Sequence, residues 1–458
     1  MSTSDKDLAA FVTATAAEYG IPGAAVGITI DGAEFTACHG VTSIDNPLPV
    51  DENTVFQLGS VSKSYTATAL LRLVADGRVA LDAPVRRYLP ELTLADEQLA
   101  AEVTVGHLLN HTAGLDWKLD AETGDGDDAL ARFVDRLPEL PVIAPLGARA
   151  SYSQSGYSLA GRVIEKVTGL TFEQAIRTLL FDPIGLRHSF FTAAEVLPHR
   201  FAVGHTADDN GELSVLRQWG DNRANNPGAG VASSVADQLR WARFHLGDGH
   251  TADGESLLPT ALLHSMREQT APLRASSLGD GFGICWFLRD VDGVRTVGHG
   301  GSGYGQFAEL LTVPDRRFAV VALSNAGPDA GLAFNQAVLR WALEHYLGLV
   351  ERDPEPLPYD ATRAAEIAGV YENDMMRLTI ADSGTAVSID AKIKPEIRAA
   401  SDTELPDDLP FADLGLRPDD EYFVTEGGLT GQRGYFSRDT TGTITGVDLA
   451  GRLFSRIP

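Results

Sequence analysis

Runs of apolar residues predict strands at two widely separated places in the chain. Near the N-terminus, the runs 24–30 and 34–39 are joined at Asp31-Gly32, a pair that favours a tight hairpin turn. Further strand-like runs follow much later, at 282–290, 294–297, 307–313 and 318–323, before a helical stretch at 332–347. Strands from both ends of a domain with helices between them are typical of an antiparallel sheet flanked by helices. We therefore predict an α+β fold with a mostly helical insert between about residues 60 and 268.

The remainder of the chain has a different pattern. Alternating prolines around 354–358 are expected to stiffen a linker. Beyond the linker, short apolar runs separated by turns predict a small antiparallel β-barrel or sandwich, with strands at 369–371, 377–380, 386–389, 422–424, 434–436 and 444–449. We expect three parts: a first domain at 1–348, a proline-rich linker at 349–360, and a β domain at 361–458.

The composition narrows the class of partner. The chain has 458 residues, of which 37 are basic and 63 acidic, giving a net charge of -26 and a pI near 4.7. This excess of acid disfavours nucleic acid and anionic membrane surfaces as partners. The two cysteines, Cys38 and Cys285, have no metal-ligand spacing and are widely separated, so we predict two reduced thiols.

The N-terminal residues carry no predicted targeting signal. Residues 1–7 form no positive n-region, and residues 8–19 have the pattern of an amphipathic helix interrupted by Glu18. No uncharged apolar run is long enough to span a bilayer. We therefore expect a cytoplasmic protein that acts on a small molecule.

The most informative motif is Ser60-x-x-Lys63, which lies at the start of a long apolar helical stretch. Residues three apart share a face of a helix, so the amine of Lys63 is expected beside the hydroxyl of Ser60. Burial lowers the pKa of a lysine, which lets its amine accept the serine proton near neutral pH. The free N–H groups at the helix start can stabilise an oxyanion. This pattern predicts an acyl-transfer nucleophile.

Two later stretches add candidate site residues. The segment 151–157 follows a turn-rich stretch and precedes an amphipathic helix, so Tyr152 on this loop can approach Ser60 and Lys63. The segment Gly298-His299-Gly300-Gly301-Ser302 lies between strand-like runs. Its glycines allow a strand edge to come close to a bound ligand.

With these motifs in this order, the chain resembles the serine beta-lactamase and penicillin-binding-protein superfamily, on its class C and esterase side. The blocks 105–115, 81–85 and 226–234 look like structural segments of that family, and the resemblance covers about residues 5 to 345. It implies a beta-lactamase-like antiparallel sheet flanked by helices. The region 361–458 resembles the lipocalin-like barrel that is appended to many esterase-type members.

The resemblance implies a role for each motif residue. Ser60 would be the nucleophile, Lys63 its base partner, and Tyr152 the residue that shuttles the proton to the leaving group. The backbone N–H groups of Ser60 and Ser302 would form the oxyanion hole. The implied substrate-binding residues are Gln154, His299, Gly300 and Gly301. No residue beyond 357 matches a catalytic motif, so we expect the barrel to influence substrate preference only.

Two positions depart from the family pattern. Gln154 stands where the family has asparagine, which moves the side-chain amide outward by about 1 Å. His299 stands where the family has a lysine, so the strand carries a weaker positive charge for a substrate carboxylate. Both changes argue against efficient hydrolysis of beta-lactam antibiotics. A His-x-Gly triplet resembles the esterase, D-aminopeptidase and transacylase members instead.

Neither a metal nor a cofactor is expected. His107 and His111 are four residues apart but lack the glutamate of a zinc-protease motif. Gly298-x-Gly300-x-x-Gly303 matches a dinucleotide pattern, but the required helix and acidic residue do not follow it.

The function that we expect is a serine hydrolase or acyltransferase that forms a Ser60 acyl-enzyme from an ester or amide, such as a D-amino-acid or secondary-metabolite derivative. Two alternatives remain open. One is an amide-bond-forming transacylase or peptide-cyclising thioesterase of antibiotic biosynthesis, with an amine as acceptor. The other is a catalytically silent binding or scaffold protein of the same fold. The motifs do not show whether water or an amine accepts the acyl group.

Overall fold

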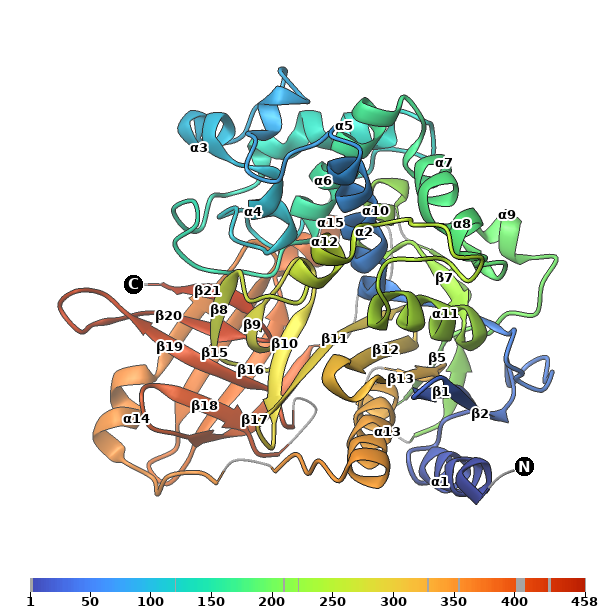
Figure 1. Cartoon of the computed structure of the whole chain (residues 1–458). Coiled ribbons are helices and arrows are strands. Elements are labelled where there is room, and N and C mark those ends of the chain that lie inside the picture. The colour runs from blue at the N-terminus through green and yellow to red at the C-terminus, as the bar shows by residue number, and fades with distance from the viewer. Residues whose placement is uncertain are drawn as a thin grey trace.

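The computed structural model shows two parts, a large α+β portion and a C-terminal closed β-barrel, which lie against each other (Figure 1). It describes residues 3–119, 121–208, 211–220, 222–327, 329–352, 355–400, 408–426 and 430–457. Residues 353 and 354 of the predicted linker lie outside these ranges.

The large portion is built on an 8-stranded antiparallel sheet of strand order β2-β1-β13-β12-β11-β10-β9-β8. The strands are β1 (Gly23–Ile30), β2 (Ala33–Gly40), β8 (Ala271–Ser276), β9 (Gly279–Phe282), β10 (Phe287–Val291), β11 (Val294–Gly303), β12 (Gln306–Val313) and β13 (Phe318–Ser324). Strand β1 pairs with β13, for example Gly27 with Val321, so the two ends of the domain meet in one sheet. This confirms the predicted sheet.

Helices cover both faces of the sheet because each face presents a row of apolar side chains. One face packs against α1 (Thr3–Glu18) and α13 (Asp329–Leu347) through a cluster that includes Leu8, Val26 and Phe334. The other face packs against α11 (Val235–Leu246) and α2 (Ser62–Ala75), where Leu239 and Leu70 are buried. Figure 1 shows these helices as layers below and above the sheet.

The insert between β3 (Val55–Gln57) and α11 is mostly helical, as predicted. Its helices are α2, α3 (Glu97–Glu102), α4 (Val105–Leu109), α5 (Ala129–Arg136), α6 (Gln154–Thr168), α7 (Phe172–Ile176), α8 (Asp182–Ile184), α9 (Ala193–Val196) and α10 (Asn226–Ala229). Short strands β4 (Ser189–Phe190) and β7 (Ala232–Ser234) join β3 in a small sheet, and β5 (His205–Ala207) pairs with β6 (Leu213–Val215). Helix α12 (Thr260–Ser265) precedes the return to the main sheet.

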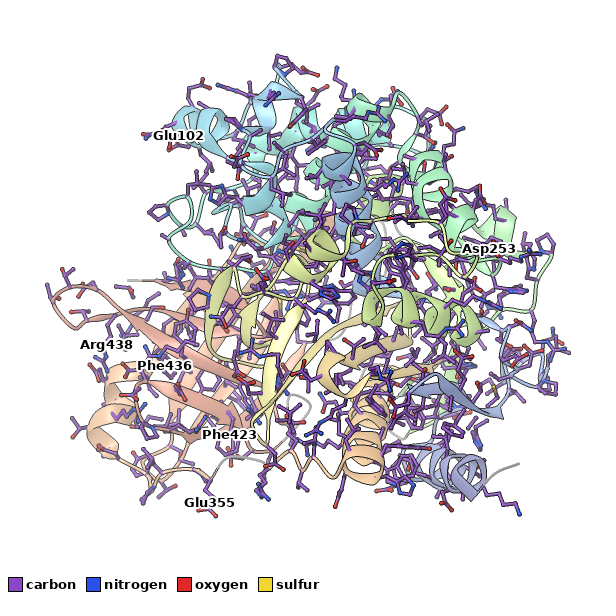
Figure 2. The ribbon with its side chains drawn as sticks, viewed as in Figure 1. Glu102, Asp253, Glu355, Phe423, Phe436 and Arg438 are labelled. Atoms are coloured by element: carbon purple, nitrogen blue, oxygen red, sulfur yellow. The ribbon has the colours of Figure 1, made fainter. Side chains whose placement is uncertain are left out.

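The C-terminal part is a closed antiparallel barrel that follows α14 (Ala361–Ile367). Its strands are β14 (Gly369–Glu372), β15 (Met376–Asp382), β16 (Val387–Ile393), β17 (Leu409–Leu416), β18 (Glu421–Val424), β19 (Arg433–Arg438), β20 (Ile444–Leu449) and β21 (Arg452–Arg456), with α15 (Pro395–Ala400) between β16 and β17. Side chains fill its interior, among them the fully buried Tyr371, Tyr422 and Phe436. Figure 2 labels Phe436 and Phe423 on the barrel and Glu355 on the linker beside it.

The sequence pattern missed several strands. The run 282–290 is interrupted by a turn at 283–286, where Cys285 has a φ of 74°, so it forms two strands instead of one. Strand β11 continues through the glycines to Gly303, beyond the predicted end at 297. The barrel has two further strands, β17 and β21, which were not predicted. Strand β21 carries Arg452.

Strands β18 and β19 of the barrel pack against the edge strand β8 of the main sheet. The backbone N–H of Arg433 donates to Ser277 Oγ at 2.8 Å, and the same hydroxyl donates to the Arg433 carbonyl at 3.2 Å. These contacts bring the turn between β20 and β21 toward the centre of the large portion. Within the described ranges, no helix is both long and apolar enough to cross a membrane.

Candidate active site

Ser60 lies in a single 3-10 turn, Gly59–Val61, that leads directly into α2. Gly59 has a φ of 51°, and a Cβ there would lie 2.5 Å from the backbone nitrogen of Ser302. The turn therefore needs glycine to pass this close to β11. The Ser60 side chain remains partly exposed.

Lys63 occupies the first turn of α2 and is fully buried. Its Nζ lies 3.3 Å from Ser60 Oγ, 2.6 Å from Gln154 Oε1 and 2.9 Å from the carbonyl oxygen of Gly228. Burial lowers the pKa of the Lys63 amine well below its usual value, and nearby Arg452 lowers this pKa further, while Cys285 opposes the shift. No carboxylate forms an ion pair with Lys63 in the described part of the chain, so the neutral amine is favoured.

The three contacts of Lys63 orient its lone pair. A neutral amine has two hydrogens and one lone pair. The oxygens of Gln154 and Gly228 carry only lone pairs toward Lys63, so each accepts one hydrogen. Ser60 Oγ is the third neighbour of the amine, at 3.3 Å, and when the amine is neutral its remaining lone pair can accept the Ser60 hydrogen. This geometry suits removal of the Ser60 proton by Lys63.

Tyr152 lies on the loop before α6, and only 4% of its surface is exposed. Its hydroxyl is hydrogen-bonded to Ser60, and the Lys63 amine lies 4.7 Å from its ring centroid. Burial raises the pKa of Tyr152 above its usual value, although the Ser60 hydrogen bond opposes the shift. Tyr152 is therefore a neutral phenol that can donate its proton, and it can take up the Ser60 proton only while it passes its own proton on. The three predicted catalytic side chains lie together.

Gln154 is the first residue of α6, and its side chain contacts Lys63 rather than an open cavity. Its Oε1 accepts from Lys63, and its Nε2 donates to the Asn225 carbonyl at 3.3 Å. The longer side chain thus reaches across to the lysine. In this structure, Gln154 holds the base, and its predicted substrate contact stays a prediction.

His299 on β11 is almost completely buried, with 1% of its surface exposed. Its Nδ1 lies 2.6 Å from the carbonyl oxygen of Gly300, which assigns the ring proton to Nδ1. Phe287 stacks on the ring with centroids 4.1 Å apart. Burial lowers the pKa of His299 to about 3, so the ring carries no charge at neutral pH. His299 offers no positive charge for a carboxylate.

The glycines after His299 allow β11 to cross directly over the Ser60 turn. A Cβ at Gly301 would lie 2.1 Å from the Leu58 carbonyl oxygen and 2.5 Å from the Ser60 nitrogen. At Gly300, a Cβ would lie 2.5 Å from Glu309 Oε1 on the neighbouring strand. The backbone segments that carry the Ser60 and Ser302 N–H groups are therefore adjacent, as an oxyanion hole requires.

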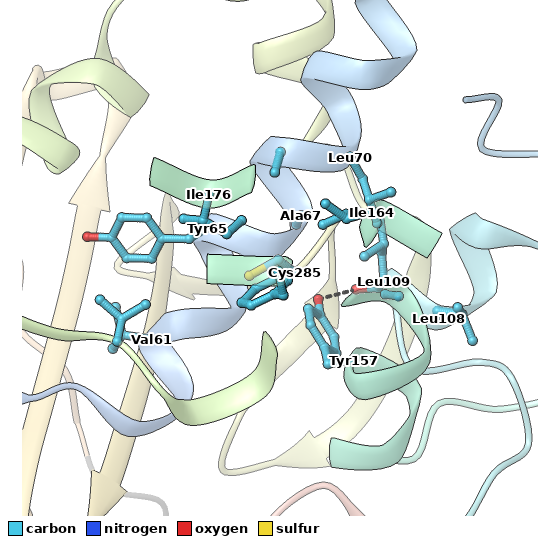
Figure 3. Packing of buried hydrophobic residues seen from close by; sticks show 14 of the residues in the cluster. Val61, Tyr65, Ala67, Leu70, Leu108, Leu109, Tyr157, Ile164, Ile176 and Cys285 are labelled. Carbon is cyan, nitrogen blue, oxygen red and sulfur yellow. Dashed lines mark hydrogen bonds between the residues drawn. The ribbon is translucent and has the colours of Figure 1, made fainter. Parts of the chain in front are cut away.

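An apolar shell surrounds the base. Tyr157, on the face of α6 toward Lys63, has its ring centroid 5.3 Å from the Lys63 amine and donates its hydroxyl hydrogen to the Leu109 carbonyl at 2.9 Å (Figure 3). Cys285 lies beside Tyr157, and burial raises the pKa of this thiol to about 12. The free Cys285 thiol is thus protonated and inert, as expected for a buried cysteine.

His111 is a neighbour of the site that the motifs did not identify. Its ring centroid lies 4.6 Å from that of Tyr152, and its Nδ1 accepts from the Ser153 N–H at 3.0 Å. His107 instead bonds Thr104 through Nδ1 and caps α4. The two histidines therefore serve different contacts. No cluster of three metal-ligating side chains occurs among the residues that the structure describes.

Arg452 of the barrel also lies next to the site, a residue that the sequence motifs did not identify. Its guanidinium carbon lies 5.1 Å from the Tyr152 ring centroid and 4.4 Å from that of Trp117. The backbone N–H of Tyr152 donates to the Gly451 carbonyl at 2.8 Å. Residues 300 positions apart in sequence cannot be paired by any local motif, so only the fold reveals this contribution.

The comparisons agree with this geometry. A family model described as Beta-lactamase matches residues 8–344. Penicillin-binding protein 4 of Amycolatopsis lactamdurans is 36% identical over 365 residues, which are 78% of this chain and 94% of that protein. Esterase EstB of Burkholderia gladioli is 31% identical over 300 residues, 58% of this chain and 74% of EstB.

Among solved structures, SurE covers 99% of both chains with a TM-score of 0.79 and 26% identity, and the structure of SurE with D-Leu gives a TM-score of 0.77 and 25% identity. A class C beta-lactamase matches 74% of this chain and 96% of its own length with a TM-score of 0.61 and 20% identity, which supports the fold alone. The likeness to SurE extends through the barrel.

Proposed function

Because this chain belongs to the beta-lactamase family, we propose that it is an acyl-transfer enzyme that forms an acyl-enzyme at Ser60 from an ester or amide. The observation that carries the proposal is the environment of Lys63: its buried amine lies within hydrogen-bonding distance of Ser60 Oγ and of two oxygens, those of Gln154 and Gly228, that can take the two hydrogens of a neutral amine. A scaffold protein has no need of a buried uncharged lysine at this place, since such burial is destabilising.

In the proposed reaction, Ser60 Oγ attacks the substrate carbonyl carbon while its proton moves to the Lys63 amine, either directly or through the Tyr152 hydroxyl, which then passes its own proton to Lys63. The N–H groups of Ser60 and Ser302 stabilise the oxyanion. The bond from the carbonyl carbon to the leaving oxygen or nitrogen breaks, and Tyr152 returns the proton to the leaving group. An acceptor then loses a proton to the same pair and attacks the acyl-enzyme ester. The bond from the carbonyl carbon to Ser60 Oγ breaks, and Oγ takes this proton back.

We further propose that the acceptor is an amine whose molecule carries a carboxylate, such as an amino acid or a peptide end. Two observations favour it. The Arg452 guanidinium stands beside Tyr152, where the proton of the acceptor would be taken, and it offers a carboxylate a positive charge at a different place from the uncharged His299. SurE, which resembles this chain over its whole length, has been solved with D-Leu. Amide formation and peptide cyclisation are both consistent with such an acceptor.

The first test is covalent labelling. A fluorophosphonate or an activated ester should add one acyl or phosphonyl group per chain, and peptide mapping should place it on Ser60. Ser60→Ala should abolish labelling, whereas Ser302→Ala, a neighbouring serine that contributes only its backbone, serves as the matched control. Labelling that persists in Ser60→Ala would show that the proposed nucleophile is wrong.

The second test is partition of the acyl-enzyme. A simple ester is offered with an amino acid, with its decarboxylated amine, and with water alone, and the products are quantified. The proposal expects the amide with the amino acid to dominate and Arg452→Leu to remove that preference while the hydrolysis product still forms. Hydrolysis as the sole outcome with every amine at saturation would leave the esterase function and exclude the transfer to amines.

A further inference from the structure

The turn between β20 and β21 is the part of the barrel that enters the active site. It is a two-residue hairpin turn closed by the pair Leu449 and Arg452. Its central residues, Ala450 and Gly451, both have positive φ values, 52° and 72°. Such turns match the twist of the flanking strands and are well defined. The turn is therefore a specific structure rather than a loose loop end.

Gly451 connects this turn to the catalytic tyrosine. Its carbonyl accepts the N–H of Tyr152 at 2.8 Å, and the next contact pairs Leu453 N–H with Ser151 Oγ at 3.4 Å. A Cβ on Gly451 would lie 2.2 Å from Leu278 Cδ1. The turn thus fits closely between β8, β9 and the Tyr152 loop, and its position determines where Tyr152 lies.

Asp448 holds Gly451 from the barrel side. Only 2% of Asp448 is exposed, and its Oδ1 accepts the N–H of Gly451 at 3.2 Å. One residue, Gly451, therefore separates the Asp448 carboxyl from the backbone of the catalytic Tyr152. Gly451 directly precedes Arg452, so the Asp448 carboxyl also influences the position of the Arg452 guanidinium.

The charged and titratable groups that face Asp448 come from both parts of the chain. Arg149 of the large portion and Arg452 of the turn act on it with positive charge, and the phenols of Tyr422 and Tyr435 lie nearby. Arg149 also bonds the barrel, through Ser437 Oγ at 3.3 Å. No ion pair within 4 Å joins Asp448 to either arginine in the described ranges, so their influence acts through space. An asparagine could accept the Gly451 bond without the cost of burying a charge.

We propose that Asp448 is a positioning residue of the acyl-transfer site: through Gly451 it fixes the backbone of Tyr152, and by its negative charge it orients the Arg452 guanidinium beside the Tyr152 ring. The inference rests on the proposed function and deepens it. In this proposal the barrel supports catalysis. Its interior is filled with side chains and does not support the role of a ligand carrier.

The pH dependence follows from the burial of the carboxyl. Burial raises the pKa of Asp448 to about 7, although the Gly451 N–H and the two arginines oppose the shift. The carboxylate forms as pH rises through about 7 and accepts hydrogen bonds more strongly than the acid. The positioning effect should therefore grow as pH rises through this range, and should be small below it.

The experiment compares Asp448→Asn with wild type in the Ser60 acylation rate by an activated ester from about pH 5.5 to about pH 8.5, a range that spans the carboxyl titration. The ratio of wild-type to variant rate cancels the titration of Lys63 and Tyr152, which both proteins share. We expect the ratio to rise through pH 7 and to reach about tenfold above it, since small displacements of a reacting group have effects of this size. Asp390→Asn, at another buried carboxyl of the barrel that pairs with Lys392, is the matched control.

Thermal unfolding distinguishes a loss of positioning at the active site from a loss of fold stability. The folded pKa of Asp448 lies above its unfolded value, so the protonated group stabilises the fold and this stability is lost as pH rises through about 7. Asp448→Asn should therefore have a Tm at pH 8 at least as high as wild type while it acylates more slowly. Asp448→Glu, which keeps a carboxyl, should retain a pH-dependent ratio.

Several outcomes would overturn the proposal. The proposal is wrong if the ratio of wild-type to Asp448→Asn rate is near one or does not change with pH. It is also wrong if the loss of rate follows a lowered Tm, or if Asp390→Asn loses as much rate as Asp448→Asn. Failure of the proposed function looks different, because Ser60 would then form no acyl-enzyme in any of these proteins.

Discussion

The amine of Lys63 lies 2.6 Å from the side-chain oxygen of Gln154, the shortest of its three polar contacts. This contact joins the start of α2 to the start of α6, and it uses one of the two hydrogens of the neutral amine. Gln154 therefore helps to direct the lysine lone pair at Ser60. The family asparagine is replaced here by a residue whose extra length reaches the base.

Gln154→Leu should slow Ser60 acylation by at least about tenfold, because it leaves a buried amine hydrogen without an acceptor. The change preserves size and burial, so the fold should persist. The rate constant of labelling by an activated ester is the measurement. Gln98→Leu, on the exposed helix α3, is the control, and equal rates for Gln154→Leu and wild type would contradict the assigned role.

Lys63→Met should slow acylation by at least about a hundredfold and raise the stability of the fold. The pKa of Lys63 is lowered in the folded state, so the unfolded chain binds the lysine proton more tightly, and this group makes stability rise with pH up to the usual value of 10.5. Methionine removes that penalty at neutral pH. Thermal unfolding at several pH values measures it, with Lys166→Met, at an exposed ion pair with Glu91, as control. A lower Tm for Lys63→Met at neutral pH would show that the lysine is buried in its charged form.

Tyr152→Phe and Lys63→Ala should each reduce the acylation rate by at least about a hundredfold, since a positioned proton transfer usually contributes on that scale. Their effects should not add in the double variant, because Ser60 is hydrogen-bonded to both side chains and the two move one proton. Single-turnover labelling of the three variants provides the comparison. Multiplicative losses would mean that the residues act independently.

Gly301→Ala should reduce acylation by about a hundredfold or more, the loss seen when an oxyanion donor is displaced. The new methyl group would meet the Leu58 carbonyl oxygen at 2.1 Å and the Ser60 nitrogen at 2.5 Å, and backbone atoms cannot move aside cheaply. Gly303→Ala on the same strand is the matched control, because its Cβ would meet nothing within 4 Å. If both variants labelled at the wild-type rate, β11 would not form part of the oxyanion hole.

The sheet and the Ser60-Lys63 pair could be predicted from the sequence because both depend on local patterns. Apolar runs bounded by turns predict strands, and a three-residue spacing places two side chains on one helix face. The contributions of His111 and Arg452 could not be predicted in this way. Their contacts with Tyr152 join segments about 40 and 300 residues apart, and nothing in the residues around Arg452 resembles a catalytic motif.

The uncharged state of His299 also could not be predicted from the sequence. A histidine on a strand edge is expected to titrate near pH 6.5 and to bind a carboxylate in part of that range. Burial of the ring removes that possibility here, because the charged imidazolium ion would have to give up its hydration. The substitution of lysine by histidine thus removes the charge from β11 instead of weakening it.

This loss of charge gives the last prediction, that penicillins and cephalosporins are poor substrates. A beta-lactam carboxylate held against β11 would meet the uncharged ring of His299, whose proton is already donated to the Gly300 carbonyl. The charge of Arg452 does not replace it on this strand, because the guanidinium approaches Tyr152 from the barrel. Turnover of a chromogenic cephalosporin should therefore be slow compared with that of a simple activated ester, and its rate should show no step near pH 6.5. His299→Gln should leave both properties unchanged, since glutamine is also neutral. Rapid cephalosporin turnover that fell on this substitution would mean that His299 carries a proton when substrate binds.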